Sequence, residues 1–205
     1  MLNQFARSAI TRLFTPIARG LLRLGIGPDA VTIVGTLGVC AGALAFYPRG
    51  EFLVGTLVIT AFVFSDNIDG IMARLSGQQS SWGAFLDSVL DRVGDAAIFI
   101  GLALWFAGRG DSLRMTALCL ACLALGAVVS YAKARAEGLG YTADVGIAER
   151  ADRLVAVLVT TGLVGLFGLP VVVLEVVLWL LAAGSLWTVL QRVRTVRRQA
   201  TVERV

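Results

Sequence analysis

Four aspartates stand at regular spacing within and beside the most apolar stretches of this sequence. They are Asp66, Asp69, Asp87 and Asp91. Residues three or four positions apart lie on one face of a helix, so each pair presents two carboxylates side by side. The polar segment between the pairs, SGQQSSWG at 76–83, is suited to a turn. The spacing therefore predicts two antiparallel helices whose four carboxylates converge.

Four converging carboxylates in a poorly solvated cavity repel one another unless they are protonated or neutralised by cations. Two divalent ions would balance the four negative charges. Oxygen ligands, in a chain with no histidine and no suitably placed cysteine, favour Mg²⁺ over zinc, with Mn²⁺ as an alternative. Pairs of such ions hold the attacking and leaving oxygens in phosphoryl transfer. The aspartates are thus interpreted as ligands of two magnesium ions in an enzyme.

Two other interpretations of the aspartates are a structural role, such as capping or pairing with arginine, and an ion pathway in a channel or transporter. Neither explains the residues around them. Arg74 lies one helical turn beyond Gly70, where it could clamp a phosphate. Gly70 and Gly83 lack side chains, so a nucleotide could approach the backbone there. The surrounding residues favour phosphoryl transfer over transport.

The composition places these residues in a membrane protein. Of the 205 residues, 57% are hydrophobic, against roughly 45–50% in soluble domains. A membrane-spanning helix needs about 20 mostly apolar residues. Six segments are candidates, near 30–47, 52–74, 84–107, 114–136, 150–168 and 171–193. The predicted fold is an all-α integral membrane protein with six transmembrane helices.

The first 24 residues differ from the apolar segments, because arginines interrupt hydrophobic residues that recur near the helical period. This pattern is typical of an amphipathic helix in the membrane interface, and Pro16 is expected to bend or restart it. The predicted organisation is an amphipathic juxtamembrane helix at 1–24, a six-helix membrane domain at 25–198 and a cytoplasmic tail at 199–205.

Basic residues indicate the orientation of these spans. An even number of spans puts both termini on one side, and arginine concentrates in the segments on that side. The positive-inside rule assigns such a side to the cytoplasm. We therefore expect both termini, and the aspartates between the second and third spans, to face the cytoplasm. A nucleic-acid partner is not expected.

The aspartates belong to a longer pattern, D-x2-D-G-x2-A-R-x8-G-x3-D-x3-D, which also includes Gly70, Ala73, Arg74 and Gly83. The pattern resembles the signature of the CDP-alcohol phosphotransferases, and the similarity extends over nearly the whole chain. This resemblance implies a six-helix membrane enzyme, usually a homodimer, in which an alcohol displaces CMP from a CDP-linked lipid. It also implies that the four aspartates bind two divalent ions and that Asp91 acts as the base.

The same resemblance suggests which residues bind the CDP-linked lipid. The segment GPDAVT would contribute Asp29 and Thr32 to the nucleotide site, where Gly70, Arg74 and Ser80 would join them. Asp29 has a second interpretation as an N-cap of the first span, because Pro-Asp is a favourable helix start. The two roles are compatible.

Polar and basic residues at the cytoplasmic ends of the later spans bear on the acceptor alcohol. A cationic pocket would select an acceptor that carries a phosphate, and the expected contacts are Ser130, Lys133, Arg153 and Arg192. Basic residues that flank spans also follow from the positive-inside bias alone.

The segments SYAKARAE, ERADRL and TPIARGLLRLGIGPDAVT resemble the actinobacterial phosphatidylinositol phosphate synthases. That subfamily uses CDP-diacylglycerol and myo-inositol 3-phosphate. The resemblance implies that the chain makes phosphatidylinositol phosphate and CMP in a bacterial cell membrane. Glycerol 3-phosphate, the acceptor of phosphatidylglycerophosphate synthases, is the alternative substrate.

Overall fold

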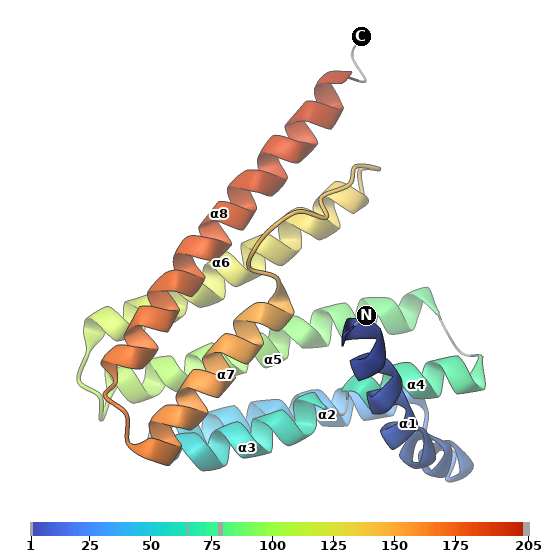
Figure 1. The fold of residues 1–205 in the computed structure, drawn as a ribbon, viewed down its shortest axis with the longest axis horizontal. Coiled ribbons are helices and arrows are strands. Elements are labelled where there is room, and N and C mark those ends of the chain that lie inside the picture. The colour runs from blue at the N-terminus through green and yellow to red at the C-terminus, as the bar shows by residue number, and fades with distance from the viewer. Residues whose placement is uncertain (1, 65, 78–79, 203–205) are drawn as a thin grey trace. The chain divides into compact units, whose positions relative to one another are not determined.

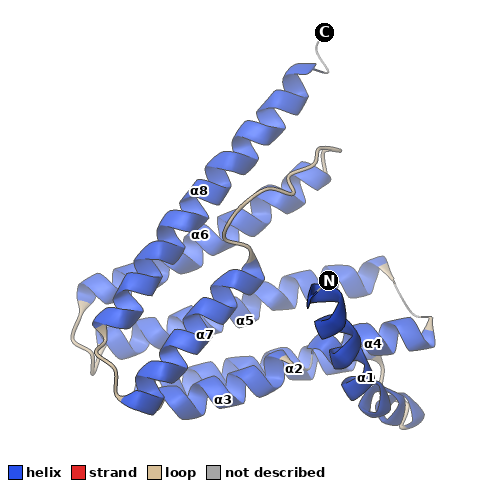
Figure 2. Cartoon of the chain, viewed as in Figure 1, coloured by secondary structure: helices blue, strands red, loops and turns tan. Residues whose placement is uncertain are grey.

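The structure is a computed structural model that describes residues 2–64, 66–77 and 80–202, including the side chains other than those of 2–11, 66 and 67. All regular structure in these ranges is helical (Figure 2), so the predicted all-α class is confirmed. The elements are α1 (Leu2–Arg23), α2 (Pro28–Phe46), the 3₁₀ turn η1 (Tyr47–Arg49), α3 (Phe52–Val63), α4 (Asp66–Ser76), α5 (Ser81–Ala107), α6 (Leu113–Glu137), α7 (Arg150–Phe167) and α8 (Val172–Val202).

Four helical stretches among the described residues are long and apolar enough to cross a membrane. They are Pro28–Arg49, Phe52–Ser76, Leu113–Glu137 and Val172–Val202. Helices α5 and α7 coincide with the other two predicted segments, but each carries several charged residues toward its N-terminal end. Length and composition therefore identify four spans, against the six predicted.

The second predicted span, at 52–74, is described as two helices. Helix α3 ends at Val63 and α4 begins at Asp66. The sequence Ser-Asp-Asn at 65–67 consists of residues that favour a helix start over a helix interior. The acidic signature therefore begins in the first turn of a new helix, where the helix dipole favours negative charge.

The described chain divides into two compact units. The first comprises 1–44 and 57–98, and the second comprises 45–56 and 99–205. Helices α2, α3 and α5 each contribute residues to both units. The first unit contains the acidic signature, and the second contains the basic residues assigned to the acceptor.

In the first unit α1 packs against α4. Ala18 of α1 is buried with Ile71 and Met72 of α4, and Phe14 and Leu21 pack against this cluster. Helix α1 covers the N-terminal segment and includes Pro16, while its place in the membrane interface remains a prediction. Part of its apolar face is used to support α4, the helix that carries Asp69 and the glycine and arginine of the signature.

Helices α2 and α3 approach each other closely at two glycines of α2. A Cβ atom at Gly38 would stand 2.3 Å from the ring of Phe62, and one at Gly42 would stand 2.9 Å from the side chain of Val58. Small residues permit such close approach between helices in lipid. The contact fixes α2, whose N-terminal turn forms one wall of the candidate site.

Candidate active site

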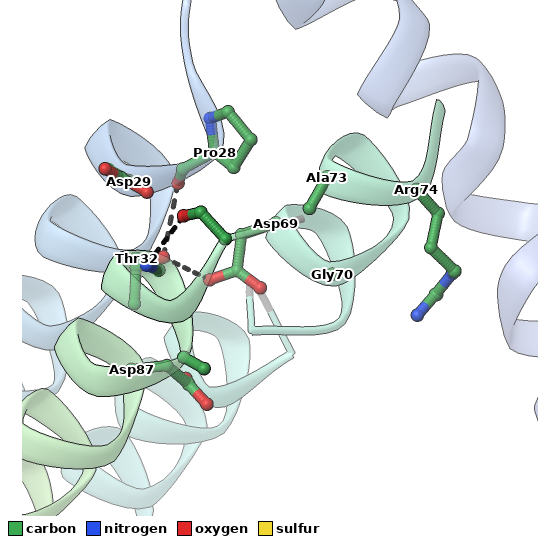
Figure 3. A pocket seen from close by; sticks show the side chains of 11 residues that line it. Pro28, Asp29, Thr32, Asp69, Gly70, Ala73, Arg74 and Asp87 are labelled. Atoms are coloured by element: carbon green, nitrogen blue, oxygen red, sulfur yellow. Dashed lines mark hydrogen bonds between the residues drawn. The ribbon is translucent and has the colours of Figure 1, made fainter. Parts of the chain in front are cut away.

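A cavity of about 250 Å³ opens in the first unit between the N-terminal turn of α2, the middle of α4 and the start of α5 (Figure 3). The three elements contribute a mixture of carboxylates, small residues and one arginine. Its lining residues are Pro28, Asp29, Thr32, Asp69, Gly70, Ala73, Arg74, Ser80, Gly83, Ala84 and Asp87. The cavity therefore collects residues from both halves of the acidic signature and from the segment GPDAVT.

Asp69 is the buried carboxylate of this cavity, with only 8% of the residue exposed. The hydroxyl of Thr32, itself buried, donates a hydrogen bond to Asp69 Oδ2 over 2.5 Å. The same hydroxyl lies 3.2 Å from the carbonyl oxygen of Pro28. A hydrogen bond to an ionised carboxylate is short and stronger than a neutral one. Thr32 therefore orients Asp69 from the opposite wall.

The second acidic pair lies on α5, which runs beside α4 in the first unit (Figure 1). Asp87 is exposed and lines the same cavity as Asp69. Asp91 follows one helical turn later, with 16% of its side chain exposed, and its Oδ2 lies 3.4 Å from a guanidinium nitrogen of Arg92. The structure thus brings Asp69 and Asp87 together, with Asp91 on the adjoining turn.

Asp66 is the first residue of α4, and its side chain lies outside the described part of the chain. Among the side chains that are described, no three acidic or cysteine residues come close enough to form a metal-binding group. The donor chemistry nevertheless suits a hard cation, because Asp69 and Asp87 offer carboxylate oxygens in one cavity. The complete set of four aspartates as ligands remains a prediction.

All five residues expected to bind the CDP-linked lipid line the cavity. Thr32 contacts Asp69, as described above, and Gly70 leaves the face of α4 open. Ser80 accepts a hydrogen bond from the backbone N–H of Gly83 over 3.0 Å and so helps to start α5. Arg74 is exposed, and its guanidinium lies near Gly70, where an added Cβ atom would be 3.7 Å from Nη1 (Figure 3).

Asp29 lies in the first turn of α2, and its carboxylate forms a contact that sequence reasoning missed. The indole N–H of Trp82, from the first turn of α5, donates to Asp29 Oδ2 over 3.1 Å. Trp82 occupies a variable position of the signature. The available signal was a tryptophan, which carries a single N–H donor, inside an otherwise polar turn.

The residues predicted to bind the acceptor phosphate lie together in the second unit, where α8 packs against α6 and α7. Arg153 and Arg192 are each only 3% exposed. Arg153 donates to the carbonyls of Ala148 and Gly126. Arg192 donates to the carbonyls of Val145 and Val129. Two cationic groups are thus held by backbone oxygens of α6 and of the segment 138–149.

Ser130 and Lys133 lie on α6 beside these carbonyls. The hydroxyl of Ser130 donates to the carbonyl of Gly126 over 3.2 Å. The ammonium of Lys133 forms ion pairs with Glu137 and with Asp144 of the segment 138–149. The hydrogen bond from Lys133 holds the pKa of Asp144 below its usual value. The cluster therefore combines three cations with exposed carboxylates, because Arg192 also lies 3.9 Å from the carboxylate of Glu149.

Comparison with known families identifies the family of the chain. The family model for CDP-alcohol phosphatidyltransferases matches residues 26–190, and the chain belongs to this family. The match includes α2, both acidic pairs and, of the basic cluster, Ser130, Lys133 and Arg153. Together with the four apolar stretches, it identifies the chain as a multi-pass membrane protein.

Within the family, the chain is similar to phosphatidylinositol phosphate synthases. It is 58% identical to the synthase of Streptomyces avermitilis over 205 residues, which cover 98% of the chain and 84% of the relative. It is 45% identical to the synthase of Mycobacterium tuberculosis H37Rv over 195 residues, which cover 93% and 88%. The resemblance inferred from the sequence is confirmed.

Two crystal structures of the M. tuberculosis synthase have the same fold. The complex with CDP-diacylglycerol superimposes with a TM-score of 0.87 at 44% identity, and covers 90% of this chain and 94% of that one. The complex with manganese and citrate superimposes with a TM-score of 0.83 at 44% identity, and covers 89% and 88%.

Proposed function

We propose that the chain transfers the phosphatidyl group of CDP-diacylglycerol to myo-inositol 3-phosphate and releases CMP. The observation that carries the proposal is the cavity in which Asp69 and Asp87 lie opposite Asp29 and Thr32. Carboxylates for a cation and polar groups for a nucleotide therefore share one cavity. The CDP-diacylglycerol complex of the mycobacterial synthase supports this choice of substrate.

The nucleotide end of the CDP-linked lipid is proposed to contact Asp29, Thr32, Gly70, Arg74 and Ser80. Asp29 offers carboxylate oxygens, which accept hydrogen bonds from amino or hydroxyl groups. Arg74 offers a planar guanidinium suited to phosphate oxygens, and it lines the cavity beside Gly70. Gly70 allows the diphosphate to approach the helix backbone.

The proposed metal cofactor is a pair of Mg²⁺ ions, with Mn²⁺ as a possible substitute, held by Asp66, Asp69, Asp87 and Asp91. The manganese complex of the mycobacterial synthase supports divalent-metal dependence in this family. When bound, such ions neutralise charge on the phosphoryl oxygens and hold the attacking and leaving oxygens. The buried position of Asp69 and its contact with Thr32 keep that carboxylate oriented before binding.

Asp91 is proposed to act as the general base. It accepts the proton of the acceptor hydroxyl as that oxygen attacks the phosphorus nearest the diacylglycerol. The bond between this phosphorus and the bridging oxygen of the diphosphate breaks, and CMP leaves with the electron pair. A positioned carboxylate is the available proton acceptor, because the chain contains no histidine.

The acceptor phosphate is proposed to bind Ser130, Lys133, Arg153 and Arg192. Buried guanidinium groups attract an anion strongly, because the surrounding protein screens charge less than water does. Their hydrogen bonds to backbone carbonyls hold them in place without cancelling their charge. A phosphorylated alcohol is therefore favoured over a neutral one.

The membrane arrangement is also part of the proposal. Helices α5 and α7 would complete six spans, with their charged N-terminal ends at the membrane surface. Residues 1–24 would lie in the interface, 25–198 would form the membrane domain, and 199–205 would form the tail. Both termini and the site would face the cytoplasm of a bacterial cell, and the chain would form a homodimer.

The experiment that tests the function measures CMP release from CDP-diacylglycerol by the purified full chain with Mg²⁺. The acceptor is varied among inositol 3-phosphate, inositol, glycerol 3-phosphate and serine. We expect release with inositol 3-phosphate alone. Preferred use of glycerol 3-phosphate would contradict the acceptor, whereas no CMP release with any acceptor would contradict the class of reaction.

Removal of divalent metal should eliminate this activity, because the proposed site places several carboxylates around one diphosphate. We expect no detectable CMP release in excess EDTA. Activity should return on addition of Mg²⁺ or Mn²⁺ in excess over the chelator, and Ca²⁺ serves as a hard cation of different size. Full turnover in EDTA would contradict the metal requirement.

Lys133→Ala should weaken binding of the acceptor. Loss of one charge-assisted contact to a phosphate costs about 1.5–3 kcal/mol, so the acceptor KM should rise about 10- to 100-fold. The KM for CDP-diacylglycerol should stay within about twofold. Arg135→Ala is the matched control, because Arg135 is an exposed cation on the same end of α6. A rise in the CDP-diacylglycerol KM alone would move Lys133 out of the acceptor site.

A further inference from the structure

The two carboxylate oxygens of Asp29 have different surroundings. Oδ2 accepts the hydrogen bond from the indole of Trp82 over 3.1 Å. Oδ1 lies nearer Gly83, where an added Cβ atom would be 3.7 Å away. Both Asp29 and Gly83 line the cavity. Oδ2 is thus hydrogen-bonded to Trp82 of α5, whereas Oδ1 lies near the space that the absent side chain of Gly83 leaves open.

The contact joins the first turns of two helices that form opposite walls of the cavity. Asp29 is in the first turn of α2. Trp82 is in the first turn of α5, whose start is fixed by the hydrogen bond between Gly83 N–H and Ser80 Oγ. The indole N–H therefore comes from a backbone position that is already held in place.

The rest of the Trp82 side chain faces outward. Trp82 is 59% exposed, and its ring lies 6.0 Å from that of Phe85, which is also exposed. Val89 continues this exposed apolar side of α5, which is opposite the side that carries Asp87. An indole with a polar N–H and a large apolar surface is typical of the membrane interface. Trp82 thus directs its N–H to Asp29 in the cavity lining, while most of its ring stays exposed.

We propose that Trp82 is a positioning residue for the nucleotide of the CDP-linked lipid. Its N–H fixes the carboxylate of Asp29, so that Oδ1 is presented to an amino or hydroxyl group of the nucleotide. A carboxylate fixed before binding loses less rotational freedom when the ligand arrives. This inference rests on the proposed function, in which Asp29 contacts the nucleotide.

The test is Trp82→Phe, which removes the N–H and keeps an aromatic ring. Because Trp82 is partly exposed, we expect the lower part of the range for a hydrogen bond to a charged group, or a rise of about 10- to 20-fold in the KM for CDP-diacylglycerol. The kcat and the acceptor KM should stay within about twofold. Trp179→Phe is the matched control, since Trp179 is 54% exposed on α8.

A double-mutant cycle tests whether Trp82 affects nucleotide binding through Asp29. In an Asp29→Ala background, Trp82→Phe should cause no further rise in the KM for CDP-diacylglycerol, because the indole has lost the group that it orients. An equal rise in both backgrounds would overturn the inference. Binding of CDP, measured by calorimetry in the presence of Mn²⁺, should show the same non-additive pattern.

An error in the proposed function can be distinguished from an error in the role proposed for Trp82. If the unsubstituted chain releases no CMP from CDP-diacylglycerol, the proposed function is wrong. If the unsubstituted chain is active and Trp82→Phe has the same KM as Trp179→Phe, the function stands and the role of Trp82 is wrong.

Discussion

Asp91→Asn should lower kcat by about 10²- to 10⁴-fold, which is the usual contribution of a positioned general base. Asparagine has nearly the same shape, and its amide oxygen can keep the contact that Asp91 makes with Arg92 at 3.4 Å. It cannot take the proton of the acceptor hydroxyl. The rate of CMP release under saturating substrates measures the effect.

A measurement of nucleotide binding distinguishes loss of the general base from loss of the nucleotide-binding site. We expect Asp91→Asn to bind CDP within about tenfold of the unsubstituted chain in Mn²⁺, because Asp69, the buried carboxylate that Thr32 orients, still offers its oxygens in the cavity beside Asp87. Asp111→Asn is a suitable control, since Asp111 is exposed and has a φ of 42°, which asparagine tolerates well. Near-normal kcat in Asp91→Asn would remove the base assignment.

The pairing of Asp69 with Asp87 illustrates what the sequence could predict. Their positions follow from helical periodicity on each side of a short polar turn, which are local properties. The family also follows from local properties, because eight residues at fixed separations identify its signature. Such features need no knowledge of how distant helices pack.

The break after Val63 and the contact of Trp82 with Asp29 were not predictable in the same way. The apolar run before Asp66 gave no reason to end a helix, and the preference of Ser-Asp-Asn at 65–67 for a helix start was outweighed by the hydrophobic pattern. The Trp82 contact joins residues that are far apart in the chain, and it depends on how α2 and α5 pack. Hydrophobic periodicity describes one helix and carries no information about its neighbours.

The basic cluster shows a third limit of sequence reasoning. Arg153 and Arg192 were assigned to the acceptor because of their charge and their places at helix ends. The structure adds that both are buried and that backbone carbonyls of α6 and of the segment 138–149 hold them. The segment 138–149 has no regular hydrophobic pattern, so its role in holding these arginines depends wholly on tertiary packing.

The predicted number of spans differs from the number that length and composition support, because α5 and α7 contain charged residues. A helix with several charged residues toward one end is less apolar than an ordinary span. Length and composition therefore identify four stretches and leave these two helices out. The six-span arrangement depends on placing their charged ends at the membrane surface.

Asp69→Asn should reduce turnover by more than about 100-fold and should also remove the stabilisation that divalent metal gives to the folded chain. Even indirect partners of a metal site cost 10- to 100-fold when they are removed, so a direct carboxylate ligand should cost more. A bound ion at 100 times its Kd stabilises a protein by about 2.7 kcal/mol. The unsubstituted chain should therefore melt several degrees higher in Mn²⁺ than in EDTA, and Asp69→Asn should melt at nearly the same temperature in both.

Thr32→Val tests the role of the hydrogen bond to Asp69 separately from the role of the Asp69 carboxylate itself. This variant removes the hydroxyl that lies 2.5 Å from Asp69 Oδ2 but keeps the negative charge. We expect weaker metal binding, with stabilisation restored at higher Mn²⁺, whereas no concentration should restore it in Asp69→Asn. The difference arises because Thr32 orients the ligand and Asp69 supplies the charge. Equal stabilisation of Asp69→Asn and the unsubstituted chain by Mn²⁺ would mean that the buried carboxylate is not a metal ligand, and the proposed chemistry would then lack its central group.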